Sequence, residues 1–171
     1  MTVVVGSPEV AQLLQTEHIP MDEHVVDELQ EAGLRQPLRA VVCCLPTPTP
    51  EGDFEEITVC ELRRRVQTQL DPALQVARAA AMEMMVAAEG GAIVFVGGRA
   101  TGAVQSSVLS ALVSLSRSIV KEYRRYRIRS NVVVVPEHPF QAFTSLRFLL
   151  SPDSVAVAGE RIDIADEMSH A

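Results

Sequence analysis

Apolar residues between positions 90 and 135 follow two different periods. A short continuous apolar run at residues 93–96 is closed by Gly97 and Gly98, which is typical of a buried strand that ends in a turn. From residue 104 to residue 120 the apolar side chains recur every three or four positions, which predicts one apolar stripe along a helix. Four valines at residues 132–135 then run into Pro136 without polar alternation, so they predict a strand buried on both faces. Strand, long helix and strand in this order predict a βαβ unit with parallel strands.

The same two periods predict the other elements. Further strands are expected at residues 3–5, 38–45 and 160–164, and further helices from residue 8, over 22–32 and over 143–150. Gly33 is the expected stop of the helix at 22–32. A much longer helical pattern follows residues 54–58, and Pro72 within it predicts a kink or a break near residues 70–71. This alternation of strands and helices predicts an α/β fold.

Composition favours a single globular domain and argues against a nucleic-acid-binding or membrane protein. A chain of 171 residues suits one domain, and its 47% apolar content without tryptophan predicts an aliphatic core. The 22 acidic and 15 basic residues give a net charge of −7, which argues against nucleic-acid binding because phosphate attraction needs a basic face. No apolar run has the length of a membrane span and no secretory leader precedes the first strand, so we expect no membrane association and a cytoplasmic location.

Three groups of reactive side chains lack a catalytic or metal-binding motif. Cys43 and Cys44 are adjacent in an apolar run and Cys60 stands alone, so we expect reduced structural thiols. The four histidines are too far apart in sequence for metal-ligand spacing, and we expect no metal site. A basic cluster at residues 121–129 has two interpretations: a solvated helix end, or a site for an anion such as the phosphates of coenzyme A. The preference of cations for a helix C-terminus favours the first.

Several sequence segments occur together in one order. They are F-E-E-I-T at 54–58, G-G-A-I-V-F-V at 90–96, S-A-L-V-S-L-S-R-S-I-V-K-E-Y at 110–123, R-I-R-S-N-V-V at 127–133 and F-L-L-S-P-D-S-V-A-V-A-G-E-R-I-D-I at 148–164. In this order and wording, residues 38–164 resemble the short-chain dehydrogenase/reductase family. The resemblance implies a truncated Rossmann-like fold, a doubly wound and mostly parallel sheet flanked by helices.

The resemblance also locates the family's functional positions, which are altered here. The family's tyrosine, a general acid, falls on Gln105, its lysine on Leu109, its serine near Gly98 and its asparagine near Gln69. An amide does not titrate near neutral pH, an aliphatic side chain supplies no cation, and glycine has no hydroxyl. The family's N-N-A-G segment is replaced by C-C-L-P at residues 43–46. We therefore expect no catalytic and no cofactor-binding residue in this chain.

Replacement chemistry is not indicated either. Ser106, Ser107 and Ser110 flank the altered positions, but they stand outside a G-x-S-x-G motif and no triad order accompanies them. Capping or contact roles are the expected ones. The first strand–helix turn contains only Gly6, whereas a dinucleotide-binding turn needs several glycines to approach a pyrophosphate.

The resemblance implies a single truncated domain, 1–171. Its parts are a reduced N-terminal βα region at 1–37, a family-like core at 38–164 and a tail at 165–171. In the family, two long helices form a contact between subunits. The residues expected at that interface are Leu62, Val66, Leu70, Ala77, Val108, Ala111, Leu112, Leu115 and Ile119.

Preserved assembly helices with altered chemistry imply a noncatalytic structural or regulatory subunit. The expected partner is an intact short-chain dehydrogenase paralogue that binds NAD, in a heterotetramer. Heteromeric family members such as 2-[hydroxy(phenyl)methyl]-succinyl-CoA dehydrogenase suggest a 3-hydroxyacyl-CoA as that partner's substrate. Two alternatives remain open: an active NAD(P)-dependent reductase with replaced catalytic groups, and a free-standing homo-oligomeric ligand-binding protein.

Overall fold

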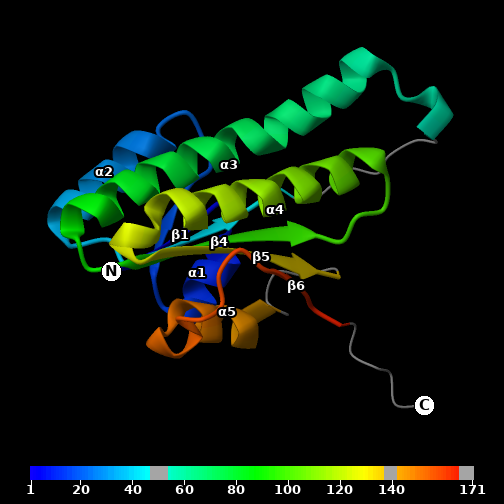
Figure 1. Cartoon of the computed structure of the whole chain (residues 1–171). Helices are drawn as coiled ribbons and strands as arrows, with labels where there is room; N and C mark the ends of the chain where they lie inside the picture. Colours follow the sequence, from blue (N-terminus) through cyan, green and yellow to red (C-terminus); the bar gives the residue numbers. More distant parts are fainter. Residues whose placement is uncertain (47–53, 137–141, 166–171) are drawn as a thin grey trace.

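A computed structural model of the chain describes residues 1–46, 54–136 and 142–165. Within these residues the strands are β1 (Thr2–Val5), β2 (Glu17–Ile19), β3 (Ala40–Cys44), β4 (Gly91–Gly98), β5 (Ile128–Val135) and β6 (Arg161–Asp163). The α-helices are α1 (Pro8–Leu14), α2 (Val25–Arg35), α3 (Val59–Ala87), α4 (Ala103–Tyr123) and α5 (Phe143–Leu150). Short 3-10 turns are η1 (Phe54–Glu56), η2 (Arg124–Tyr126) and η4 (Pro152–Ser154). The order of elements along the chain is visible in Figure 1.

The strands form one sheet in the order β2-β1-β3-β4-β5-β6, and every neighbouring pair is parallel. The predicted α/β class and its parallel βαβ unit are therefore confirmed. The direction of winding reverses between β1 and β3, which is the topological switch point of the sheet. In open parallel sheets of this kind ligands bind outside the carboxyl ends of the strands at the switch point.

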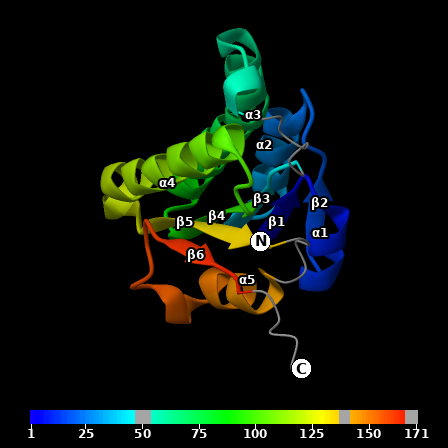
Figure 2. The ribbon, with the colours of Figure 1, turned by 90° about the vertical axis from the view of Figure 1, so that its right-hand side faces the viewer.

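Both faces of the sheet are covered by helices. On β5, Val132 and Val134 pack into the cluster under α2, α3 and α4, whereas Val133 and Val135 pack into the cluster over α1 and α5. Figure 2 shows these two layers of helices on opposite sides of the sheet. All four valines are at most 3% exposed. The prediction of a strand buried on both faces is thus confirmed, and the alternation of side chains supplies each face in turn.

Strand β2 is one element that the sequence patterns do not predict. Its three residues, Glu17, His18 and Ile19, include a single aliphatic side chain, so no strand period is visible. The segment becomes a strand because β1 offers an open edge: Val4 is in register with His18, and the Gly6 amide donates to the Ile19 carbonyl at 3.0 Å. Tertiary pairing here overrides weak local propensity.

Gly33 does not end α2, and the prediction of a stop at this position was wrong. The helix continues to Arg35 and its C-cap is Gln36. A Cβ atom at position 33 would lie 2.4 Å from Oε2 of Glu83 on α3. The glycine therefore serves the close contact between α2 and α3, and helix termination is left to the residues that follow.

The break expected at Pro72 is also absent, since α3 is continuous over its 29 residues. Proline removes one backbone donor, but its fixed φ angle is compatible with a helix. The turns directly after it are held against the sheet by Ala73, Val76 and Ala77, which are at most 2% exposed. Burial of this small-residue face compensates for the missing hydrogen bond.

One helix, α4, is long and apolar enough to span a membrane, although the sequence analysis expected no such segment. Together with η2 it forms a stretch, Ala103–Tyr126, that by length and apolar composition meets the test for a membrane span. In the structure its most apolar face serves another purpose. Val108, Leu109 and Leu112 are fully buried within the chain, packed into the cluster beneath the helices. A core helix of an α/β protein can have the same apolar content as a membrane helix.

A pair of hydroxyls joins α4 to β5 inside the core. The Oγ atoms of Ser116 and Ser130 lie 2.8 Å apart, and both side chains are fully buried. Each serine satisfies the other, which removes the cost of burying an unpaired hydroxyl.

This pair predicts a non-additive double-mutant cycle. Ser116→Ala or Ser130→Ala alone leaves one buried hydroxyl without its partner and should lower the free energy of unfolding by about 1–3 kcal/mol. The double variant should lose less than the sum of the two single variants, because no orphaned hydroxyl remains. Chemical denaturation followed by circular dichroism measures all four proteins, and additive losses would show that the two hydroxyls are energetically independent.

Candidate functional site at the carboxyl edge of the sheet

Three of the four family-equivalent positions predicted from the sequence meet at one place. Gly98 is the last residue of β4, and Gln105 and Leu109 lie on the first turns of α4. The Nε2 atom of Gln105 donates to the carbonyl oxygen of Gly98 at 3.3 Å. A Cβ atom added to Gly97 would lie 3.1 Å from Cδ2 of Leu109. The end of β4 and the start of α4 are therefore in direct contact.

These positions are filled with packed side chains. Gln105 and Leu109 are both 0% exposed. The Gln105 amide donates to the backbone, and Leu109 belongs to the core cluster. Neither side chain can release or accept a proton near neutral pH. At positions 105 and 109 the chain supplies packing and no general acid.

Gln69 comes from a different helix. It belongs to α3, in the part of that helix between residues 59 and 72 that has no fully buried side chain. Its Oε1 atom is shielded from solvent and has no hydrogen-bond partner within the described residues. The structure shows no hydrogen bond from Gln69 to Gly98 or Gln105 in the described part of the chain.

The turn between β1 and α1 stands where a doubly wound fold binds phosphate. Gly6 has a φ angle of 87°, and a Cβ atom there would lie 2.6 Å from the carbonyl oxygen of Cys44. Ser7 caps α1 by accepting from the Val10 amide at 3.4 Å, and its own hydroxyl donates to the Glu9 carboxylate at 2.9 Å. Backbone hydrogen bonding, followed by the bond from Ser7, lowers the pKa of Glu9. A carboxylate thus occupies the first helical turn, and its charge disfavours a second anion there.

The two cysteine thiols of β3 are not activated. Cys43 and Cys44 are buried in β3, and desolvation raises the pKa of Cys44 to about 12 and that of Cys43 still further. Cys60 is exposed at the start of α3, and all three cysteines are free. A thiol with a raised pKa is a poor nucleophile at neutral pH, so Cys43 and Cys44 fit the predicted role of core residues.

Histidines and serines add no catalytic arrangement to the described residues. His18 is half-buried on β2, and His24 is exposed with its Nε2 atom 3.6 Å from the Glu23 carboxylate. No group of three potential metal ligands occurs in the described part of the chain, while His138 and His170 lie outside it. Ser107 donates to the Ala103 carbonyl at 2.8 Å, the back-bonding expected of a helical serine.

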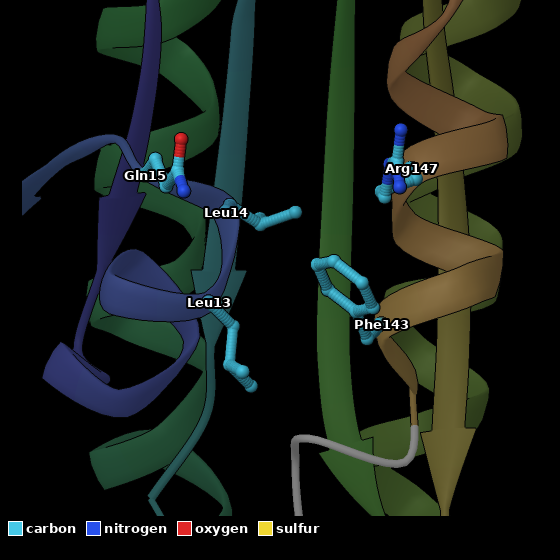
Figure 3. A pocket seen from close by; sticks show the side chains of 5 residues that line it. All are labelled: Leu13, Leu14, Gln15, Phe143 and Arg147. Carbon is cyan, nitrogen blue, oxygen red and sulfur yellow. The ribbon is translucent and has the colours of Figure 1, made fainter.

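A small cleft lies between α1 and α5 on the other face of the sheet. Figure 3 shows Leu14 of α1 and Phe143 of α5 pointing toward one another, with Gln15 and Arg147 at the rim. The cleft has a volume of about 280 Å³. This volume is near the lower limit for ligand pockets in proteins. The cation that lines the cleft, Arg147, has its Cζ atom 5.7 Å from the centroid of the Phe143 ring. We assign no chemistry to this cleft.

The predicted basic cluster divides in the structure. Arg125 stacks over the ring of Tyr126 with its Cζ atom 4.6 Å from the centroid. Arg129 donates to the carbonyls of Leu149 and Ser154 at 3.2 and 3.0 Å, which ties β5 to the ends of α5 and η4. Arg129 also lines a groove at the opposite, amino edge of the sheet, together with Lys121, Arg124 and Arg127 of the predicted cluster and with Arg117. Sequence reasoning did not include Arg117 because it lies inside α4, upstream of the charged run.

Comparison with known proteins supports the fold and leaves residue roles open. No protein-family model and no curated protein matches the sequence. A short-chain dehydrogenase/reductase from Mycobacterium ulcerans superposes with a TM-score of 0.77 at 17% identity, covering 95% of this chain and 87% of that chain. An oxidoreductase of the same family from Burkholderia thailandensis gives 0.78 at 17%, covering 95% and 90%. One from Brucella ovis, in complex with a partially ordered NAD, gives 0.71 at 18%, covering 96% and 98%.

The chain therefore has the fold of the short-chain dehydrogenases/reductases, a Rossmann-like α/β fold. Identities below 20% in these comparisons show the fold alone. The residues at the switch point do not fit a bound NAD. Gly6 is closed against Cys44, Glu9 supplies a negative charge, and Leu109 replaces the cation that the family resemblance requires. No reaction step through NAD is derived for this chain.

Restoring the family's lysine should destabilise the fold. Leu109→Lys places an ammonium group at a fully buried site among apolar side chains. Because a buried charge without a partner is costly, we expect the free energy of unfolding to fall by about 3–5 kcal/mol. Ser110→Lys, one residue further along α4 and exposed, is the matched control and should change stability by less than about 0.5 kcal/mol. Equal denaturation midpoints for the two variants would show that position 109 is open to solvent.

Proposed function

We propose that this chain is a noncatalytic structural or regulatory subunit of a hetero-oligomeric, NAD-dependent short-chain dehydrogenase, assembled in the cytoplasm as a heterotetramer with an intact paralogue. The intact subunit supplies the NAD site and the chemistry. By resemblance to heteromeric family members, its proposed substrate class is a 3-hydroxyacyl-CoA. The observation that carries this proposal is the first half of α3.

Helix α3 is longer than the sheet that it covers. Its 29 residues extend about 44 Å, whereas the eight residues of β4 extend about 26 Å. Figure 1 shows the amino-terminal part of α3 projecting past the carboxyl edge of the sheet. The buried residues of α3 begin only at Ala73. We call residues 59–72 the overhang of α3.

The apolar face of α3 continues into the overhang. Leu62, Val66 and Leu70 are spaced by four residues and lie on the side of the helix that buries Ala73 and Ala77 further along. They pack against the margin of the chain's own core cluster and stay half-buried, and Val59 at the tip is 74% exposed. Isolated helical segments of this length are marginal in water, so an apolar face of this kind is stabilised when another surface covers it. A helix of a second subunit would meet that need.

Helix α4 presents a face that suits close contact with another helix. Its solvent side carries small residues: Ser106, Ser107, Ser110, Ser114 and Ser118. Ala111 and Leu115 flank this side and are half-buried. Small side chains let two helix axes approach closely, and the neighbouring leucine supplies apolar area. This face and the overhang of α3 form the surface that we propose for assembly.

Four residues of the predicted interface belong to the chain's own core. Ala77, Val108, Leu112 and Ile119 are at most 5% exposed within the single chain. They face inward because α3 and α4 must bury their most apolar sides against the sheet and each other. The interface proposed here therefore uses the five half-buried residues, Leu62, Val66, Leu70, Ala111 and Leu115.

Two rival functions are separated by simple measurements on the purified chain. An active reductase with replaced groups requires the nicotinamide ring to bind beside Gln105, although both Gln105 and Leu109 are buried. A free-standing homo-oligomeric binding protein requires a defined oligomer without any paralogue. Solubility gained only on coexpression with an intact paralogue favours the subunit proposal over both.

We predict that the purified chain leaves the nicotinamide fluorescence of NADH unchanged. This signal reports the ring itself, so it distinguishes a dinucleotide site from phosphate binding elsewhere on the chain. The intact paralogue is the positive control and should change the emission. A saturable change that is also seen with Lys121→Gln combined with Arg124→Gln, which removes two cations of the groove at the amino edge, would favour the reductase alternative.

A charge on the proposed assembly surface should block the complex. Ala111→Arg adds a long cation at a half-buried position on α4, and we expect loss of the complex with the intact paralogue in light scattering. Gln30→Arg, on the exposed side of α2, is the matched control and should leave the complex mass unchanged. Both variants should retain the circular dichroism of the parent chain. An unchanged mass for a folded Ala111→Arg complex would contradict the proposed surface.

A further inference from the structure

A groove of about 540 Å³ lies at the amino edge of the sheet, beside the carboxyl end of α4. Five cationic side chains line it: Arg117, Lys121, Arg124, Arg127 and Arg129. Its apolar lining consists of Val120, Ile128, Val155 and Ala158. Because α4 runs antiparallel to the strands, this groove and the filled positions at Gln105 and Leu109 lie at opposite edges of the sheet.

The positive charge of the groove is not neutralised within the described chain. No carboxylate there lies within 4.0 Å of any of the five cations. Arg117 donates from Nε to the Gly159 carbonyl at 3.3 Å, and Arg129 bonds to carbonyls and to the Ser154 hydroxyl. These neutral acceptors fix the two side chains in place but leave their charges uncompensated. One-third of the 15 basic residues of an acidic chain thus converge on one surface.

The groove is more than a solvated helix end. Lys121 and Arg124 lie at the end of α4 and in η2, but Arg117 lies well inside the helix and Arg129 comes from β5. Arg127 has a φ angle of 58° in the link between η2 and β5. Cations that only complement the helix dipole would sit in the last turn and point into water. Here α4, η2 with its C-cap, and β5 each contribute cations to one groove, whose apolar lining we call its floor.

The chemistry of the lining indicates the class of ligand. Guanidinium groups pair with phosphate through two parallel hydrogen bonds, and four of the five cations are arginines. Several cations around one space favour a ligand with more than one phosphate. The apolar floor, with Val155 74% exposed beside it, offers a surface for a ring or an acyl group. The volume is that of a small-molecule pocket.

We propose that this groove binds a small molecule that joins two or more phosphate groups to an apolar or aromatic moiety. The phosphates lie among Arg117, Lys121, Arg124 and Arg127, and the apolar moiety lies against Val155 and Ala158. The proposal does not depend on the assembly described above, because the groove is built by a single chain. It gives the chain a ligand of its own at the edge of the sheet opposite the switch point.

Titration calorimetry of the full chain with ATP and with inorganic tripolyphosphate tests the proposal. We expect both to bind with one site per chain at physiological salt, and ATP to bind more tightly because only ATP can use the apolar floor. Lys121→Gln combined with Arg124→Gln should weaken both probes at least about tenfold, since two phosphate contacts are lost. Arg63→Gln combined with Arg78→Gln removes two exposed cations of α3 and should leave both affinities unchanged.

A third variant separates the two halves of the groove. Val155→Asn keeps every cation and should weaken ATP while leaving tripolyphosphate unchanged. Absence of binding by either probe at millimolar concentration would overturn the proposal, and so would equal losses in the α3 control. A hexaglutamate peptide that bound more tightly than ATP would overturn the small-molecule assignment and identify the groove as a docking site for an acidic protein segment. Each outcome is independent of whether the chain assembles with a paralogue.

Discussion

The requirement to shield both faces of a parallel sheet determines most of this structure. Every strand pair is parallel, and the central strands carry apolar side chains on both sides. Helices α2, α3 and α4 cover one face and α1 and α5 cover the other. Burial of this kind dominates the free energy of folding. It also decides which side chains of α4 point inward, and positions 105 and 109 are among them.

The side chains at positions 105 and 109 contribute packing at the carboxyl edge. Gln105 satisfies the Gly98 carbonyl, and Leu109 fills space beside Gly97. An ionisable pair at these positions would need solvent access or charged partners, since burial without them is costly. The opposite edge shows the reverse arrangement: its cations remain open to solvent around an apolar floor. Within the described residues the two edges of the sheet therefore differ: positions 105 and 109 are packed at the first, and five cations line a groove at the second.

Sequence patterns predicted the parts of the fold whose periodicity is long and uninterrupted. The βαβ unit from β4 to β5 and the buried valine strand follow directly from spacing. Strand β2 was not predicted, because its pairing with β1 makes it a strand and its own residues show no strand pattern. The predictions at Gly33 and Pro72 were wrong because neighbouring elements determine the roles of these residues. Glu83 of α3 lies close to Gly33, and buried side chains directly after Pro72 hold α3 against the sheet. The family resemblance predicted that Gly98, Gln105 and Leu109 lie close together. The groove around Arg117 could not be predicted from the sequence, because its lining residues meet only in the folded chain.

The overhang of α3 is the feature that most directly connects structure with the proposed role as a subunit. Its apolar face has no fully buried side chain before Ala73, and Leu62, Val66 and Leu70 pack only against the margin of the core cluster. Amide hydrogen exchange along α3, in the free chain and in the complex with the intact paralogue, tests this connection. The account predicts that amides of residues 62–72 slow at least about tenfold on assembly, while those of residues 73–87 are protected in both states. Overhang amides that exchange at the same rate in the complex as in the free chain would contradict it.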